Sequence, residues 1–426
     1  MALIIQKYGG TSMGSVERIT NVAKRAAKWA RAGYKVVVVP SAMSGETNRL
    51  LALADEITAG VVVKSQKLLR EQDAIAATGE QVSVGLLSMA LQVQGQDAIS
   101  FAGWQVPVQT DGAYTKARIK NIDAARVHKE LDEGKVVIIT GFQGICPDGN
   151  VTTLGRGGSD TSAVAIAAAL KADECLIFTD VDGIYTTDPR VVPDAQRMDT
   201  ISFEEILELS SLGSKVLQIR SVEFAGKFKV PTRVLSSLTP WDIPIEEEIN
   251  SGTLITYEEK KMEHAIVSGI AFSRDEAKIS VLKVPDLPGS AYKILGAVAD
   301  ANIEVDVIIQ NMSHEGFTDF SFTVSIKEYE ATLALLKEKV LPQLGKETTV
   351  VGDPKISKVS IVGIGMRSYA GVASQMFKAL SDENINIQMI STSEIKTSVV
   401  IDEKYMELAV RALHKAFNLG LEENKK

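Results

Sequence analysis

Cysteine and histidine are scarce in this chain of 426 residues. The only two cysteines, Cys146 and Cys175, exclude a disulfide-stapled scaffold and favour a reducing, cytoplasmic environment. The four histidines are scattered, and no pair has the spacing of metal ligands. We therefore expect no metal site built by the protein alone, and we look for function in charged and glycine-rich segments instead.

Long apolar runs and an excess of basic residues are also missing. No apolar stretch approaches the ~20 residues that span a bilayer, so no membrane association is expected. The first residues, MALIIQKYGG, predict a strand and a glycine turn rather than a signal peptide. The formal net charge of −8 argues against nucleic acid as a partner, because such binding needs clustered Lys and Arg. The length suggests about two to four globular domains.

The first half of the chain alternates strand and helix patterns. The β-branched run Val36–Val39 predicts a strand that is buried on both faces, as in a parallel sheet. Further strands are predicted at Leu3–Gln6, Val136–Thr140 and Cys175–Thr179, and helices at about Val16–Ala32 and Ser162–Leu170. This alternation predicts a layered α/β domain whose ligand site lies at the carboxyl ends of the strands.

The second half contains an internal repeat. The segment AKISV at 277–281 resembles SKVSI at 357–361, and DANI at 300–303 matches DENI at 382–385, an offset of about 80 residues. Each copy predicts a βαββαβ unit, with strands at Phe320–Ile326 and Thr397–Ile401. A segment rich in proline and glutamate separates the halves. The predicted domains are a catalytic domain at 1–240, a linker at 241–262 with a strand near Gly252–Thr256, and two modules at 263–345 and 346–426.

Two glycine-rich segments are the first candidates for chemistry. After the first strand, Gly9 and Gly10 let backbone N–H groups approach an anion, and Lys7 adds a full positive charge. A plain turn with a surface lysine explains this segment equally well. In LGRGGSD at 154–160, Arg156 can grip a carboxylate through two hydrogen bonds. Asp160 can act there as a simple helix N-cap, but the density of glycines around Arg156 favours a functional role.

Three further loops carry acidic or hydroxyl side chains. The aspartates of TDVDGIY at 179–185 suit ribose hydroxyls or a metal–nucleotide, and an Asx-turn is the structural alternative. SAMSGETN at 41–48 and TGEQ at 78–81 both lead into predicted helices. Glu80 can meet a substrate ammonium, or it can merely complement a helix dipole.

Together, these segments resemble the aspartokinases. KYGGTS, VVPSAMSGETN, TGEQ, TLGRGGSDTSA, TDVDGIYTTDPR and GSKVLQIRSVEFA occur in the family's order, and the resemblance covers essentially the whole chain. It implies an amino-acid kinase (carbamate kinase-like) α/β/α sandwich followed by two ACT-type βαββαβ modules. The implied reaction is phosphoryl transfer from Mg-ATP to the β-carboxylate of L-aspartate, which gives 4-phospho-L-aspartate and ADP. This is the first step towards lysine, threonine and methionine.

The resemblance also implies roles for individual residues. The family's catalytic lysine falls on Lys7, which Asp160 orients, while Arg156 would clamp the substrate α-carboxylate and Glu80 its ammonium. The substrate contacts are Ser41, Thr47, Glu80, Arg156, Gly157, Gly158 and Ser159. The ATP contacts are Lys7, Tyr8, Gly9, Gly10, Thr179, Asp180, Asp182, Tyr185, Arg190 and Lys215. A carboxylate nucleophile is already ionised at pH 7, so no general base is expected.

The modules are expected to sense amino acids, with lysine and threonine as the inhibitors. The implied effector residues are Asp286, Leu287, Pro288, Gly289, Ser290, Ala291, Glu304, Val305, Asp306 and Gln310 in the first module, and Val372, Ala373, Asn386, Ile387, Ser393 and Glu394 in the second. A role in dimerisation alone remains an alternative. The chain is expected to form a homo-oligomer, or an α₂β₂ assembly whose small subunit starts at Met262.

Two other functions are compatible with parts of the sequence. Another amino-acid kinase, acting on glutamate, acetylglutamate or a nucleoside monophosphate, would share the glycine loops. Those relatives lack the module pair and the SAMSGETN segment. An amino-acid sensor with an inactive kinase domain is the second alternative, and the presence of Lys7, Arg156 and Asp160 argues against it.

Overall fold

The computed structural model describes residues 1–61, 63–212, 216–257, 266–312, 316–364, 366 and 369–420. Its contacts divide the chain into two compact units. The first contains residues 1–184, 197–210 and the described part of 215–261. The second contains mainly residues 185–196 and the described part of 262–426. Residues 185–196 thus group with the second unit by their contacts, whereas the sequence predicted a catalytic domain that runs to residue 240.

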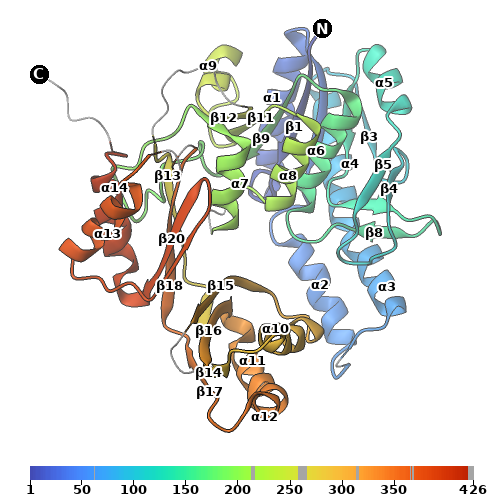
Figure 1. The fold of residues 1–426 in the computed structure, drawn as a ribbon. Coiled ribbons are helices and arrows are strands. Elements are labelled where there is room, and N and C mark those ends of the chain that lie inside the picture. Colours follow the sequence, from blue (N-terminus) through green and yellow to red (C-terminus); the bar gives the residue numbers. More distant parts are fainter. Residues whose placement is uncertain are drawn as a thin grey trace, which may run out of the picture. The chain divides into compact units, whose positions relative to one another are not determined.

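An eight-stranded sheet forms the centre of the first unit, in the order β10-β12-β11-β9-β1-β2-β6-β3 (Figure 1). All neighbouring strands pair in parallel except β11 and β12. The run Val36–Val39 is fully buried, as predicted for a central parallel strand. The strands are β1 (Leu3–Tyr8), β2 (Lys35–Pro40), β3 (Ala98–Phe101), β6 (Val136–Ile139), β9 (Glu174–Thr179), β10 (Thr200–Ser202), β11 (Thr232–Ser236) and β12 (Thr253–Thr256).

Helices cover both faces of this sheet, so the first unit forms the expected α/β/α sandwich (Figure 1). Successive side chains of a strand point to opposite faces. In β9, Leu176 and Phe178 therefore pack in the core with α1 and α4, whereas Ile177 faces α6 and α8. The helices are α1 (Val16–Arg31), α2 (Glu46–Ile57), α3 (Gln66–Ala76), α4 (Thr78–Val93), α5 (Ala125–Asp132), α6 (Gly158–Leu170), α7 (Phe203–Ser211), α8 (Ile219–Phe228) and α9 (Ile245–Asn250).

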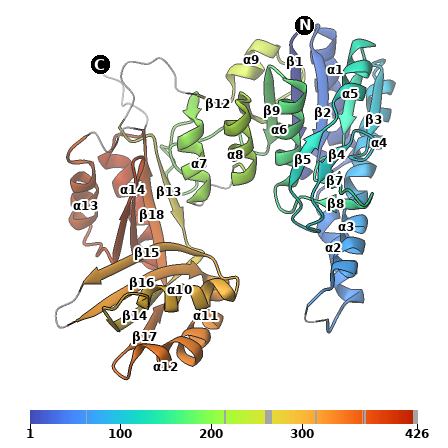
Figure 2. The ribbon, with the colours of Figure 1, turned by 45° about the vertical axis from the view of Figure 1, so that its right-hand side comes forward.

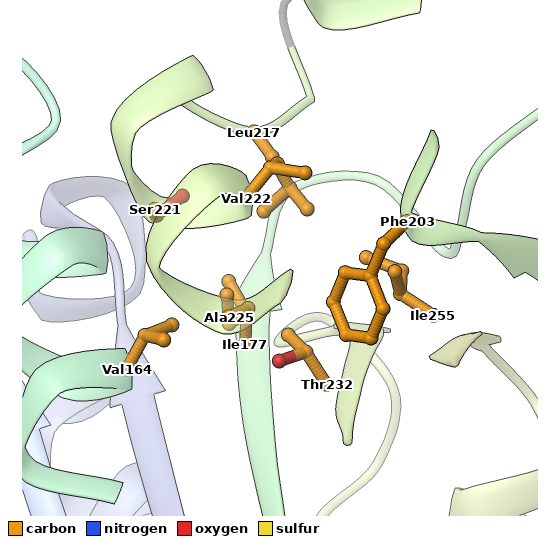
Figure 3. A pocket seen from close by; sticks show the side chains of 9 residues that line it. All are labelled: Val164, Ile177, Phe203, Leu217, Ser221, Val222, Ala225, Thr232 and Ile255. Carbon is orange, nitrogen blue, oxygen red and sulfur yellow. The ribbon is translucent and has the colours of Figure 1, made fainter. Parts of the chain in front are cut away.

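The α6–α8 side of the sheet contains a small packing gap. Val164, Ile177, Val222 and Phe203 converge on it (Figure 3). Its lining is almost entirely apolar, and it has no room for a water molecule. This gap is part of the core, because a ligand site needs space and converging polar groups.

A smaller four-stranded sheet, in the order β5-β4-β7-β8, precedes α6 in the first unit. Its strands are β4 (Val108–Thr110), β5 (Ile119–Ile122), β7 (Gln143–Ile145) and β8 (Val151–Thr153). The chain leaves β8 directly into the loop that carries Arg156 and then enters α6. That helix begins at Gly158, four residues before the predicted start, because its first turn consists of Gly and hydroxyl residues that carry little helix signal.

Residues 66–93, which form α3 and α4, are long and apolar enough to cross a membrane by length and composition alone. Half of the most apolar stretch is buried inside the protein, and Val84, Leu87 and Leu91 of α4 belong to the core of the first unit. A helix buried in a protein core can have the same length and apolar composition as a membrane-spanning helix. The absence of membrane association stays a prediction.

The second unit contains two four-stranded antiparallel sheets with the orders β15-β16-β14-β17 and β19-β20-β18-β13 (Figure 2). The first has helices α10 (Ser290–Asp300), α11 (Tyr329–Leu335), η3 (Leu336–Val340) and α12 (Leu341–Leu344). The second has α13 (Val372–Asp382) and α14 (Met406–Ala416). The strands are β13 (Gly269–Ser273), β14 (Glu276–Pro285), β15 (Val305–Met312), β16 (Phe317–Ser325), β17 (Thr349–Asp353), β18 (Ile356–Val362), β19 (Met389–Thr392) and β20 (Lys396–Asp402).

The two sheets correspond strand for strand, which confirms the internal repeat. The predicted division at 345/346 is nevertheless crossed twice. Strand β13 lies before that division but pairs with β18, and β17 lies after it but pairs with β14. The first copy therefore forms the predicted βαββαβ unit. The second copy is βαββα within the described residues, and β13 takes the place of its last strand. β13 and β17 therefore occupy equivalent edge positions in the two sheets, each paired with the first strand of the other copy.

The predicted linker at 241–262 was also partly wrong. Strand β12 lies where the sequence suggested a strand, but it pairs with β10 and β11 in the large sheet, and α9 precedes it in the same unit. Glu248 of α9 is buried and accepts hydrogen bonds from Lys28 and Trp29 of α1. This segment is part of the first unit. Residues 258–265, which include Met262, lie outside the described residues.

Candidate active site

The loops selected from the sequence leave adjacent strands at the same edge of the large sheet. Tyr8, at the end of β1, is opposite Pro40 of β2 and Phe178 of β9. The N–H of Gly9 donates to the carbonyl of Phe178 at 3.3 Å, and the N–H of Ser41 donates to that of Tyr8 at 2.9 Å. Carboxyl ends of parallel strands are where α/β proteins bind ligands. Three of the predicted segments therefore start side by side there.

Lys7 and Asp160 form the ion pair of this site. Lys7 Nζ lies 2.5 Å from Asp160 Oδ1, and the two side chains are only 10% and 12% exposed. Asp160 is in the first turn of α6, but Gly157 is the N-cap residue and no side-chain cap bond is made. The N-cap interpretation of Asp160 was therefore wrong. A Cβ built on Gly9 would lie 3.6 Å from Lys7 Nζ, so the ammonium lies against the glycine turn.

Glu80 contributes a buried carboxylate from the first turn of α4. It is 2% exposed, and its Oε1 accepts a hydrogen bond of 3.0 Å from the N–H of Ala42. Burial raises the pKa of Glu80 to about 7, although the Ala42 bond opposes this shift. Its Oε2 is buried without a hydrogen-bond partner. A substrate ammonium beside this oxygen would supply the missing partner and lower the pKa again.

Close backbone contacts join the remaining loops. A Cβ on Gly10 would lie 3.3 Å from the Ala42 carbonyl, and one on Gly141 would lie 2.8 Å from Ser159. Ser41 and Thr47 are half-buried in the segment after β2, and Ser159 is buried in the first turn of α6. The structure thus brings together Lys7, Asp160, Ser159, Glu80 and the loops after β1, β2 and β6.

Arg156 lies exposed in the loop between β8 and α6. Its neighbours Gly155 and Gly157 have φ angles of +79° and +67°, which favour glycine. A Cβ at Gly157 would meet the Gln218 side chain at 1.7 Å, so a larger residue does not fit there. A Cβ at Gly158, the first residue of α6, would lie 2.8 Å from the Phe142 side chain. Gly155 and Gly157 hold the main chain on both sides of Arg156 in a conformation that other residues rarely adopt.

The amino acid kinase family model matches residues 2–236, and an ACT domain model matches residues 359–417. The aspartate kinase of Pseudomonas fluorescens (strain SBW25) is 60% identical over 423 residues, which cover 98% of this chain and 98% of that protein. The chain belongs to the aspartokinase family. Two solved structures, both of Escherichia coli aspartokinase III, have the same fold over 97% of this chain and 99% of theirs. The complex with aspartate and ADP is 27% identical with a TM-score of 0.77, and the complex with lysine and aspartate is 26% identical with a TM-score of 0.75.

The nucleotide residues implied for this aspartokinase are divided between the two units, apart from one that lies outside the described residues. Thr179 and Asp180 follow β9 directly, and Thr179 Oγ1 donates to Asp180 Oδ1 at 3.1 Å. Asp182 is exposed nearby in sequence. Tyr185 and Arg190 fall in residues 185–196, which group with the second unit. There Arg190 is largely exposed and donates to the Asp188 carboxylate from Nε and Nη2. Lys215 lies outside the described residues.

The side chain of Tyr8, one of the implied nucleotide residues, faces the protein core. It is fully buried and stacks on Phe178, with ring centroids 4.7 Å apart. Its hydroxyl donates to Gln6 Oε1 at 3.1 Å, and burial holds the pKa of the phenol far above its usual range. Because neighbouring strand residues face opposite sides of the sheet, Lys7 points toward Asp160 and Tyr8 toward the core. Only the backbone of Tyr8 is available to a nucleotide.

The implied effector residues of this aspartokinase are divided between loops and packed positions. Asp286, Gly289 and Ser290 form the turn before α10, where Gly289 has a φ of +94° and Ser290 Oγ donates to Pro285 O at 2.8 Å. Glu304, Asp306 and Gln310 are exposed on or beside β15. In the second module, Val372 is buried in the hydrophobic core, and Ile387 is half-buried against it. Asn386, Ser393 and Glu394 are exposed.

Asp306 has a partner that the sequence did not indicate. Together with Glu276, it forms ion pairs with the ammonium of Lys358 on β18; the Lys358–Glu276 distance is 2.5 Å. Lys358 is only 3% exposed. The two acids raise the pKa of Lys358 although its burial acts in the opposite direction. An implied effector residue of the first copy is thereby tied to a buried lysine of the second.

Two residues at the active-site edge of the large sheet were not predicted from the sequence. Thr140 follows β6 and is fully buried, and its hydroxyl has no hydrogen-bond partner. Phe142 has a φ of +68°, which is a strained conformation for a residue other than glycine, and strain of this kind gathers at functional sites. The only sequence signal was the TGF segment directly after a buried strand, the same position that Gly9 and Ser41 occupy after β1 and β2.

Proposed function

We propose that this aspartokinase transfers the γ-phosphoryl group of Mg-ATP to the β-carboxylate of L-aspartate, and that lysine and threonine bound at the two modules inhibit it. The observation that carries the catalytic part is the meeting of Lys7, Asp160 and Glu80 at one sheet edge with two glycine loops. Family membership and the fold shared with an aspartate- and ADP-bound relative support the same reaction.

The chemistry follows from the charges in the site. The substrate carboxylate is ionised at neutral pH, so it attacks phosphorus without a general base. The difficulty is the repulsion between two anions, which positioned cations and backbone N–H donors reduce most in the transition state. Lys7, held by Asp160, and the amides of the Gly9–Gly10 turn supply these groups. Gly9, Gly10, Gly157, Gly158 and Ser159 offer main-chain contacts to phosphate and substrate.

Substrate selection rests on the groups that meet the amino-acid end of aspartate. Glu80 has a buried oxygen without a partner, which suits the ammonium, while the exposed guanidinium of Arg156 suits the α-carboxylate. Ser41 and Thr47 supply hydroxyls beside Glu80. A molecule that lacks the ammonium leaves the buried Glu80 carboxylate unpaired, which is costly. A molecule that lacks the α-carboxylate loses the contact with Arg156.

Magnesium is expected to arrive with the nucleotide. Within the described residues, no group of three His, Cys, Asp or Glu side chains has the geometry of a metal site. Mg²⁺ is usually held by one or two carboxylates together with substrate phosphates, and the exposed Asp180 and Asp182 fit that limited role. Bound there, the ion would neutralise charge on the β- and γ-phosphates.

The regulatory proposal concerns the repeated modules. The ACT family match at 359–417 and the equivalent strand order of the first copy support two amino-acid-binding modules. The lysine complex of the related E. coli enzyme supports lysine as an effector. Threonine, a cytoplasmic location, and a homo-oligomer or an α₂β₂ assembly with a start at Met262 complete the proposal. Purified native protein that never shows a second, smaller band would exclude the internal start.

An ADP-release assay tests the function directly. With Mg-ATP present, aspartate should give rapid turnover, and glutamate, acetylglutamate and a nucleoside monophosphate should give almost none. Omitting Mg²⁺ should abolish turnover. Lysine and threonine, titrated singly and together, should lower the rate. Equal turnover with another acceptor would reject aspartate as the substrate, and nucleotide binding without any turnover would favour the sensor alternative.

A further inference from the structure

Asp73 is a buried carboxylate for which the reaction has no use. It lies near the end of α3 and is 1% exposed, and among the described residues it accepts hydrogen bonds from neutral groups of Thr115 and Thr153. Its Oδ2 accepts from the N–H of Thr153 at 2.8 Å and from that of Thr115 at 2.9 Å, and its Oδ1 accepts from Thr153 Oγ1 at 2.7 Å. Burial raises the pKa of Asp73, and these hydrogen bonds oppose the shift. One anion therefore joins the last residue of β8 to the segment around Thr115.

Arg220 joins the same two segments from the opposite side. It lies in the first turn of α8 and is half-buried. One outer nitrogen donates to the carbonyl of Leu154 at 2.5 Å, and the other donates to that of Ala117 at 3.1 Å. A guanidinium is suited to this bridge because its planar donors can reach two acceptors at once.

The two bridges enclose a short piece of paired backbone. Between them, the N–H of Ala117 donates to the carbonyl of Thr153 at 2.9 Å, and Leu154 N–H donates to Phe142 O at 2.9 Å. In the direction of Arg156, Leu154 is the last residue that these bonds hold. Two residues later comes Arg156, exposed and flanked by Gly155 and Gly157. Glycines lose more conformational freedom on ordering than other residues, so the loop needs a fixed starting point.

We propose that Asp73 and Arg220 are positioning residues for aspartate binding: they fix the backbone from which Arg156 reaches the substrate α-carboxylate. This inference rests on the role proposed above for Arg156. Neither residue touches the substrate. A displacement of the guanidinium by even about 1 Å weakens a two-bonded carboxylate contact, so loss of either bridge acts on aspartate rather than on ATP.

Three substitutions test whether the bridges affect the KM for aspartate without affecting the KM for ATP. Arg220→Met keeps the apolar stem and removes both bonds, Arg220→Lys keeps a charge that can reach one carbonyl, and Asp73→Asn keeps the shape. Arg220→Met and Asp73→Asn should raise the KM for aspartate about tenfold, with Arg220→Lys in between, while the KM for ATP changes less than about twofold. Arg233→Met is the matched control. It removes an arginine that bonds Glu174 and the carbonyl of Ile249 in the same unit, so it should lower thermal stability and leave the aspartate KM unchanged.

A double-mutant cycle with Arg156→Ala distinguishes positioning from general stabilisation. If Arg220 acts through Arg156, Arg220→Met should change the aspartate KM less than about twofold in the Arg156→Ala background. A full effect in that background would overturn the proposal, as would an unchanged aspartate KM in all three variants. Should Arg220→Met fail to fold, Arg220→Lys replaces it in the cycle. If Arg156→Ala alone leaves the aspartate KM unchanged, the role of Arg156 is wrong and the positioning proposal fails with it. If Arg156→Ala raises the aspartate KM about tenfold but the substitutions of Arg220 and Asp73 do not change it, only the role of the two bridges is rejected.

Discussion

Lys7 Nζ of β1 and Asp160 Oδ1 of α6 lie 2.5 Å apart, although the two residues are 153 positions apart in the chain (7 to 160). The pair is nine-tenths buried, so it is poorly screened by solvent. Lys7 also lies against Gly9, whose turn supplies backbone amides. The position of the proposed catalytic cation is thus set by a carboxylate from a distant helix.

Asp160→Asn should leave the Lys7 ammonium without the charged partner that holds it. We expect kcat to fall about ten- to a hundredfold, because the ammonium is no longer held at the phosphoryl group, while both KM values change less than about threefold. Steady-state kinetics with aspartate and Mg-ATP would measure this. Asp188→Asn, which removes a partner of the exposed Arg190 in the second unit, is a matched carboxylate control. A kcat within twofold of wild type would show that Asp160 does not orient Lys7.

The ionisation of Glu80 should be visible in the pH dependence of aspartate use. Its pKa of about 7 in the substrate-free protein means that it becomes neutral as the pH falls below 7. kcat/KM for aspartate should therefore decrease by up to about tenfold per pH unit below 7 at saturating Mg-ATP. In Glu80→Gln, kcat/KM should be low and lack this titration. A wild-type profile that stays level from pH 8 to pH 5.5 would remove Glu80 from ammonium binding.

The ionisation of Glu80 should also affect stability, which should fall as the pH rises, whereas kcat/KM falls as the pH decreases. The folded-state pKa of Glu80 is raised above its unfolded value, so its contribution to stability is fully present below about pH 4.5 and is lost as the pH rises through about 7. Without aspartate, Glu80→Gln should be more stable than wild type at pH 8 and similar to it at pH 5. Chemical denaturation at the two pH values would measure the difference. A variant that is less stable at pH 8 would contradict the burial argument.

The buried lysine between the two regulatory sheets should be important for the second unit. Lys358→Met leaves Glu276, which is only 13% exposed, without its cation. Removing one partner of a buried ion pair costs about 3–5 kcal/mol, so we expect a clear loss of stability in urea. Asp306→Asn is the control: its side chain is 53% exposed, and it should cost less than about 1 kcal/mol. Equal, small effects of the two substitutions would indicate that Lys358 finds no strong partner.

The elements that positioned the site were largely predictable, because their signals are local. The β-branched run of β2 and the apolar face of α1 follow from residue spacing alone, and both elements lie within one or two residues of their predicted bounds. Since parallel strands place their carboxyl ends at one edge, the prediction of a shared site needed no further information. The glycine segments after β1 and before α6 were predictable because their composition is also a local signal.

What the sequence did not reveal depends on partners that are distant in the chain. The burial of Tyr8 depends on stacking with Phe178, and the ion pairs of Lys358 depend on two acids in the other repeat. The exchange of β13 and β17 between sheets is a matter of strand pairing, for which single residues carry little signal. Asp73 and Arg220 drew no attention because a charged residue on a helix is usually solvated; only the structure shows that both end on backbone groups beside Thr153 and Leu154.

The central claim is that Lys7 stabilises the transition state of transfer between two anions. Lys7→Ala should therefore lower kcat by more than about a hundredfold and leave the KM for aspartate within about threefold of wild type, since the lost contact is strongest in the transition state. A correctly folded Lys7→Ala variant that retained near-normal kcat, or one that lost only affinity for aspartate, would contradict the account.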